Sequence, residues 1–156
     1  MTLKEKFEQF GFRVVLTRKD MGGLYNPLSS NKKRSEMEKR QSIIKKAKAD
    51  LVVSVHMNSF PSDEVRGAQV FYAEDSESGR AFAESVQSYL HKKVKYAKKT
   101  AKVGDYYILN CSNSPSILVE CGFVSNAEEE AMLLDENYRN EFCYYVLCGA
   151  LMYFEM

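Results

Sequence analysis

Two short and nearly uninterrupted apolar runs constrain the fold of this chain more than any other feature. They occupy residues 51–55 (LVVSV) and 116–121 (SILVEC). Runs of this length, without the polar alternation of a half-exposed strand, are typical of parallel strands covered on both faces. A sheet covered on both faces needs helices on either side, so the runs predict an α/β fold.

The rest of the pattern supplies further strands and the covering helices. Apolar residues at helical spacing predict a first helix ending near Gly11, and others at 35–48, 78–93, 125–134 and 136–153. Ser125 or Asn126 is expected to cap the fourth of these. β-branched and aromatic runs predict additional strands at 12–17, 67–73 and 105–109. The result is a three-layer sandwich with a mostly parallel central sheet flanked by helices, in a right-handed winding.

Length and composition fit one soluble domain that extends over residues 1–156. Hydrophobic residues make up 45% of the chain and charged residues 28%, as in ordinary globular proteins. The longest apolar stretch, 144–154, is about half of the roughly 20 residues needed to cross a bilayer, so we expect a core helix there and no membrane-spanning segment. The first residues are amphipathic and charged throughout, so no signal peptide is expected in the chain as given.

Four cysteines show no spacing typical of a zinc finger or a CxxC motif. Cys143 and Cys148 fall on one expected helix, which is a poor geometry for a disulfide. We therefore expect reduced and mostly buried thiols at all four positions, the other two being Cys111 and Cys121. Free thiols fit a reducing or anaerobic setting better than an oxidising one.

The charge distribution is uneven although the net charge is only +1. Residues 1–50 carry 13 Lys/Arg against 6 Asp/Glu, and residues 92–102 hold six lysines. Such clusters can attract an anionic partner, but lysine runs are more often solvated helix ends. A nucleic-acid-binding module using 92–102, with Tyr96 interleaved, is one alternative, although the sequence carries no recognised nucleic-acid-binding motif.

A histidine and a glutamate stand at the ends of the two apolar runs. Parallel strands bring their C-terminal ends to one edge of the sheet, so His56 and Glu120 can meet in one crevice. Each alone has a structural explanation, as a hydrogen-bonded histidine or a paired glutamate. Together they suit metal-assisted hydrolysis, with His56 as a zinc ligand and Glu120 as a proton shuttle. Zinc hydrolase sites use three protein ligands, and His91 on the lysine-rich helix is not expected to be one.

Several stretches resemble, in order and spacing, the zinc-dependent N-acetylmuramoyl-L-alanine amidases of the amidase_3 type. The most specific parts are His-x-Asn at 56–58 and Val-Glu-x-Gly-Phe-x-Ser-Asn at 119–126. The stretch 104–126 is particularly similar to the CwlD-like members that act in sporulation and germination. The matching stretches cover nearly the whole chain, at 11–18, 40–59, 66–72 and 114–142.

The resemblance implies hydrolysis of the amide between N-acetylmuramic acid and L-alanine in peptidoglycan, outside the cytoplasm in the cell wall or spore cortex. It assigns a zinc ligand to His56 and the catalytic glutamate to Glu120. Arg18 and Arg40 match positions near the cleft, where a structural role is favoured over substrate contact. Asn58 is expected to shape the turn that follows the ligand.

The beginning of the chain departs from the family pattern. Family members start with a strand ending in Gly-His-Gly-Gly, which supplies one zinc ligand, and a helix whose early glutamate supplies another. Residues 1–12 match only the second half of that helix, and Glu5 and Glu8 lie too close to Gly11 to replace the missing ligand. We therefore expect an amidase domain that lacks its first strand, the start of its first helix and two of three ligands, with weak or no zinc binding. The alternative is a non-catalytic relative that binds the cell wall.

Overall fold

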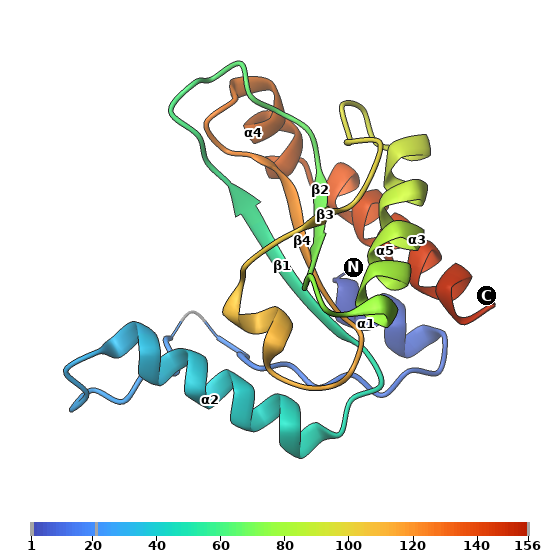
Figure 1. Cartoon of the computed structure of the whole chain (residues 1–156). Helices are drawn as coiled ribbons and strands as arrows, with labels where there is room; N and C mark the ends of the chain where they lie inside the picture. Colours follow the sequence, from blue (N-terminus) through green and yellow to red (C-terminus); the bar gives the residue numbers. More distant parts are fainter. Residues whose placement is uncertain (1, 21, 156) are drawn as a thin grey trace.

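The sheet of the computed structural model has four strands in the order β1–β4–β2–β3 within the described residues, 2–20 and 22–155 (Figure 1). β1 (Val52–Asn58) pairs in parallel with β4 (Ser116–Phe123). β2 (Gln69–Tyr72) is antiparallel to β4 and parallel to the two-residue β3 (Lys102–Val103). Two of the three pairings are therefore parallel, which confirms the expected α/β class with a mostly parallel sheet.

Helices cover both faces of this sheet. The long helices α3 (Glu77–Lys93) and α5 (Glu136–Phe154) pack together on one face, with α1 (Leu3–Gln9) against α5 (Figure 1). The 3₁₀ helix η1 (Tyr107–Asn110) packs on β4 from the other face, and α2 (Lys32–Ala47) contacts η1. The short helix α4 (Ala127–Leu134) follows β4 directly. The layered arrangement expected from sequence is thus confirmed.

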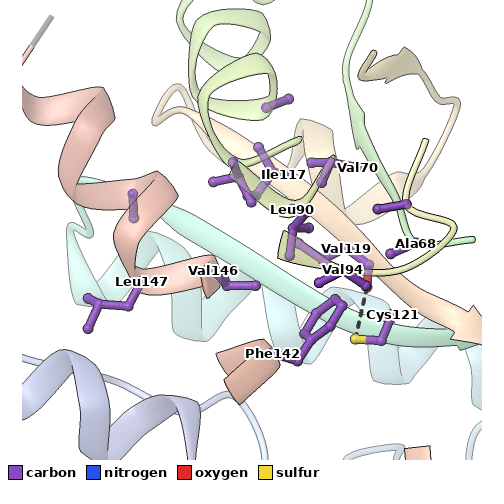
Figure 2. Close-up of a cluster of buried hydrophobic side chains, with 14 of the residues drawn as sticks. Ala68, Val70, Leu90, Val94, Ile117, Val119, Cys121, Phe142, Val146 and Leu147 are labelled. Carbon is purple, nitrogen blue, oxygen red and sulfur yellow. Dashed lines mark hydrogen bonds between the residues drawn. The ribbon is translucent and has the colours of Figure 1, made fainter. Parts of the chain in front are cut away.

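The main hydrophobic core lies between β4, β2 and the helices α3 and α5 (Figure 2). Its fully buried members include Phe82, Leu90, Ile117, Val119 and Leu147. A smaller cluster of Ala73, Leu109 and Leu118 lies on the opposite face, under η1. Every residue of β4 is buried, as predicted for an apolar run covered on both faces.

Most elements lie where the sequence predicted them. Helices occur close to 35–48, 78–93 and 136–153, and the first helix ends just before Gly11. Asn126 is the N-cap of α4, because its side chain accepts a hydrogen bond from the Glu129 amide. All four cysteines are free, with Cys111 and Cys121 buried. Among the described residues, no helix combines the length and apolar composition that a membrane crossing requires.

The strand predicted at 12–17 is not present. The segment has no ladder partner among the described residues, and Arg13 reaches across to donate to the backbone oxygen of Ala47 at 3.0 Å. β-branched residues favour extended backbone, but a strand also needs a neighbour with which to exchange hydrogen bonds. Local sequence cannot supply that neighbour, so the prediction was wrong.

The strand predicted at 105–109 is also wrong, because these residues lead into η1. Tyr106, Ile108 and Leu109 all pack against the cluster around Leu118. In a strand, consecutive side chains point to opposite faces, so Ile108 and Leu109 could not share one contact surface. The tighter turn of η1 places both side chains against the sheet.

The third correction concerns β1, which was predicted to be covered on both faces. Val55 is 54% exposed and Met57 62%, so the second half of β1 is open to solvent. One edge of β1 is paired with β4, and the other has no strand beside it in the described residues. The strand also continues past His56 to Asn58, with an irregular register between them.

Shortening a buried side chain of α5 should destabilise the fold. Leu147 is fully buried, so Leu147→Ala leaves a cavity and should lower the free energy of unfolding by about 2–5 kcal/mol. Met152→Ala on the same helix is the control, because Met152 is 38% exposed and should cost much less. Urea unfolding followed by circular dichroism measures both, and equal losses would contradict the assigned core.

Candidate active site

His56 and Glu120 lie side by side across the parallel β1–β4 pair, where they are direct register partners. Glu120 shares a face with Leu118, two residues earlier, and that face carries η1 and α2 rather than the α3–α5 core. Register partners on neighbouring strands point to the same face, so the two side chains emerge together. The juxtaposition expected from sequence is therefore present.

Glu120 is a buried carboxylate with an unsatisfied oxygen. Its side chain is 7% exposed, and Oε2 has no hydrogen-bond partner in the described residues. Burial raises the pKa of Glu120 above its ordinary value. Burying a carboxylate without a partner costs free energy, so such groups are uncommon outside functional sites. A carboxyl with a raised pKa can both accept and return a proton near neutral pH.

His56 lies at the exposed part of β1 with its Nε2 atom 3.0 Å from the Ser54 hydroxyl. Partial desolvation and then the charge of Arg40 lower the pKa of His56. The neutral imidazole is accordingly favoured, and this is the form that binds metal ions. Its environment thus suits a ligand, although it does not identify one.

Arg40 connects α2 to the extended segment that precedes it. Its guanidinium donates to Glu36 Oε1 at 2.6 Å and to the Thr17 hydroxyl at 3.2 Å, and it is half-buried. These contacts support the structural role favoured for Arg40. Arg18, the next residue after Thr17, is exposed and makes no hydrogen bond or ion pair within the described residues.

Asn58 holds the chain at the end of β1. Its side-chain oxygen accepts from the Ser59 amide at 2.8 Å, and its backbone oxygen accepts from the Val124 amide at 2.9 Å. The first bond is the local contact expected of a turn-shaping asparagine, and the second ties the turn to the end of β4. A role of Asn58 or Arg18 toward substrate stays a prediction.

The donor set does not amount to a zinc site by itself. No group of three or more His, Cys, Asp or Glu side chains in the described part of the chain is arranged to hold a metal ion. His56 offers one imidazole, whereas catalytic zinc takes three protein ligands. His91, the second histidine, is engaged elsewhere, with Nδ1 3.1 Å from the Ala97 carbonyl oxygen.

Two polar residues near Glu120 were not singled out from sequence. Gln69 of β2 is the antiparallel partner of Glu120, is buried, and donates to Gln87 on α3 at 3.1 Å. Glu129 is 3% exposed, although it belongs to the acidic first turn of α4. The position of Gln69 inside an apolar strand could have identified it from sequence. No local feature of the sequence indicated that Glu129 would be buried.

An apolar groove with a volume of about 430 Å³ lies beside β1 on the α5 side. Val55 and Met57 of β1 line it together with Leu3 of α1 and Phe142 of α5. The groove therefore adjoins the open part of β1, close to where the described chain begins.

Comparisons with known proteins identify the family. The Amidase_3 family, N-acetylmuramoyl-L-alanine amidase, matches residues 1–150. The chain belongs to this family. The germination-specific N-acetylmuramoyl-L-alanine amidase of Bacillus subtilis is 26% identical over 97% of this chain and 66% of its own length. The chain thus spans less than two thirds of that relative.

Solved structures agree with this assignment. The CwlD amidase from Clostridioides difficile, solved in complex with the GerS lipoprotein, superposes with a TM-score of 0.90 at 31% identity, over 98% of this chain and 81% of that one. The catalytic domain of the amidase CwlV from Bacillus (Paenibacillus) polymyxa gives 0.83 at 26% identity, over 98% and 79%. The resemblance to amidase_3 enzymes, including CwlD, and the fold are confirmed.

The cysteine environments of this amidase-family chain predict unequal thiol reactivity. Burial raises the pKa of Cys121 to about 12. The reactive thiolate at pH 8 is then on the order of a thousandfold scarcer than for a free cysteine. Alkylation of the native protein, followed by peptide mass spectrometry, should modify the half-buried Cys148 well before Cys121. Unfolding in urea should equalise the two rates, and equal rates in the native protein would contradict the described packing.

Proposed function

We propose that this chain forms most of the catalytic domain of a peptidoglycan hydrolase that cleaves the amide between N-acetylmuramic acid and L-alanine of the stem peptide. The observation that carries the proposal is the register pair His56 and Glu120, in which a buried oxygen of Glu120 has no hydrogen-bond partner among the residues that the structure describes. Membership of the amidase family and the germination-specific relative support the same substrate. The corresponding place of action is the cell wall or spore cortex.

Glu120 would act as general base and then as general acid. Its carboxylate takes a proton from the water that adds to the lactyl carbonyl carbon, and it returns the proton to the nitrogen of L-alanine as the C–N bond breaks. The products are the lactyl carboxylic acid and the free amine of the peptide. A raised pKa, caused by burial, suits a group that must both take up and release the proton.

We further propose that the domain is completed by residues outside this sequence. A strand added along β1 would cover its open edge, and adjoining residues would fill the groove next to Val55 and Met57. The 19% of the C. difficile CwlD chain that this chain leaves uncovered is consistent with such an addition (100 − 81). An open strand edge is otherwise prone to non-native pairing.

Zinc would be held by His56 together with ligands supplied by the completing residues. When bound, the ion would supply an activated water and polarise the scissile carbonyl. His56 fits this assignment because its lowered pKa favours the neutral imidazole. The described residues alone provide too few ligands.

A non-catalytic wall-binding relative is the second candidate, favoured by the incomplete donor set. Lysines exposed on α2, among them Lys39 and Lys46, could attract anionic wall polymers. Binding to purified sacculi without release of muropeptides would support this candidate over the hydrolase. The Cζ atom of Arg66 and the Nζ atom of Lys95 lie 4.0 and 4.6 Å from the centre of the Tyr96 ring. These side chains occupy the ring on which a base would stack, so a nucleic-acid-binding module is disfavoured.

Replacing the proposed base separates catalysis from stability. In a protein extended upstream in its genomic frame, Glu120→Gln should lower kcat on a muropeptide substrate by about 10²–10⁴-fold, because the amide cannot accept the proton. At pH 7 the same variant should melt no lower than the original protein, because burial disfavours the charged carboxylate. Any gain in the free energy of unfolding of the variant should shrink as the pH falls from the raised pKa of Glu120 in the folded protein to its ordinary value. The folded protein then holds a protonated Glu120, which is as neutral as the glutamine that replaces it.

The control for Glu120→Gln is Glu130→Gln, an exposed acid on α4. It should leave both the rate and the melting temperature unchanged. Retention of full amidase activity by Glu120→Gln would refute the assignment of the general base.

Metal content tests the proposed completion of the site. Elemental analysis should find little zinc on the 156-residue chain, and about one zinc per chain in a protein extended upstream in its genomic frame. His56→Ala in the extended protein should lower this occupancy, because the ion loses a ligand. If the extended protein also lacks zinc, the hydrolase proposal fails and the wall-binding candidate is the better account.

A further inference from the structure

Glu129 is the best-satisfied buried carboxylate near the site, and it belongs to neither proposed catalytic role. One oxygen accepts from the Gly67 amide at 2.9 Å, and the other accepts from the Gly67 amide at 3.0 Å and the Phe123 amide at 2.8 Å. The side chain is 3% exposed. Hydrogen bonds to an ionised acceptor are about twice as strong as neutral ones, so this is a firm attachment.

Glycines make this attachment possible. A Cβ atom on Gly122 would lie 3.3 Å from the Glu129 carboxylate carbon and one of its oxygens, so a side chain there would crowd the bonds. Gly67 has φ +107°, and a Cβ atom on it would overlap the Tyr96 carbonyl oxygen. The β4 segment can approach the carboxylate because Gly122 has no side chain at that point, and Gly67 can lie against the Tyr96 backbone for the same reason.

The two amides held by Glu129 belong to the strands on which Glu120 depends. Phe123 is the last residue of β4, three residues beyond Glu120. Gly67 lies just before β2, two residues ahead of Gln69, the antiparallel partner of Glu120. One carboxylate thus joins β4 and β2 at the end where Glu120 emerges.

Asn126 extends the attachment to the loop after β1. Its side-chain oxygen accepts from the Glu129 amide at 3.0 Å, and its side-chain nitrogen donates to the Asp63 carbonyl oxygen at 2.6 Å. The neighbouring Ser125 hydroxyl accepts from the Phe60 amide at 3.0 Å. The start of α4 therefore holds the loop from β1, the end of β4 and the entry to β2 in one arrangement.

We propose that Glu129 is a positioning residue, which fixes the β4 end and the β2 entry so that Glu120 is held in a reactive orientation beside His56. This inference rests on the proposed function. Glu120 has no hydrogen bond at Oε2 in the described residues that could orient it. Its direction must therefore be set by the backbone on either side, which Glu129 holds.

Glu129→Gln tests this role with little change of shape. With the NH₂ group in the place of Oε1, one bond from the Gly67 amide is lost and replaced by repulsion. With the NH₂ group in the place of Oε2, bonds from both the Gly67 and Phe123 amides are lost. Because small misplacements of a catalytic group are costly, kcat on a muropeptide should fall about 10- to 100-fold with little change in KM. Assays are made well below the melting temperature of the variant, and Glu130→Gln is the matched control.

A second measurement reads the backbone independently of activity. Amide exchange followed by NMR should accelerate at Gly67 and Phe123 in Glu129→Gln, and the amide chemical shifts of residues 120–122 should move. Neither change is expected in Glu130→Gln. Unaltered shifts at 120–122, or an unchanged kcat despite lost protection at Gly67 and Phe123, would overturn the positioning role. A rise in KM with kcat unchanged would overturn it too.

The two measurements also separate this inference from the proposed function. If the unmodified protein shows no amidase activity in its zinc-loaded extended form, the proposed function fails. The amide chemical shifts of residues 120–122 in Glu129→Gln then still show whether Glu129 fixes the backbone conformation at Glu120. If the unmodified protein is fully active and the amide shifts in Glu129→Gln are unaltered, only the positioning role is refuted. The proposed function is then retained.

Discussion

A charge at the end of a fully buried strand is the constraint on which the rest of the structure depends. β4 is buried along its whole length and pairs on both sides, so it organises the sheet and both hydrophobic clusters. Glu120 lies on this strand, where solvation is poor and its pKa is raised by burial. The neighbouring elements must therefore either satisfy the carboxylate or leave it available for chemistry.

Two buried glutamates, nine positions apart, show these two outcomes. Glu129 accepts hydrogen bonds from two backbone amides and holds three chain segments together. Glu120 has one oxygen with no hydrogen-bond partner among the described residues, beside an exposed histidine. Satisfied buried charges stabilise local structure, whereas unsatisfied ones cost stability and are retained where they serve a function. This contrast supports the two proposed roles, positioning for Glu129 and proton transfer for Glu120.

The open edge of β1 is the second structural feature that shapes the site. His56 and Met57 lie on the part of β1 that faces solvent, next to an apolar groove. The continuous apolar run led us to expect a strand covered on both faces as far as Val55, which is instead 54% exposed. The arrangement places the buried Glu120 beside an exposed histidine and leaves too few metal ligands within the described residues.

Local patterns were reliable where the interaction itself is local. Helical spacing found α2, α3 and α5. A cap at Ser125 or Asn126 was expected, and Asn126 provides it, because the capping bond spans only three residues. The same reasoning failed at 12–17 and 105–109, where composition favoured strands. A ladder partner and a shared packing surface are contacts between distant parts of a chain, and neither is encoded in a window of a few residues.

For the candidate site, the sequence by itself determined the residue types and their places at strand ends: His56 and Glu120, with Asn58 and Gly122 after them. The family motifs in the sequence then assigned the chemistry. Only the tertiary structure decided that His56 and Glu120 are register partners and that Glu129 reaches Gly67 across 62 positions. It also decided that one oxygen of Glu120 finds no hydrogen-bond partner in the described part of the chain. Register, burial and long-range hydrogen bonds depend on how separate segments pack, so they exist only once the chain has folded.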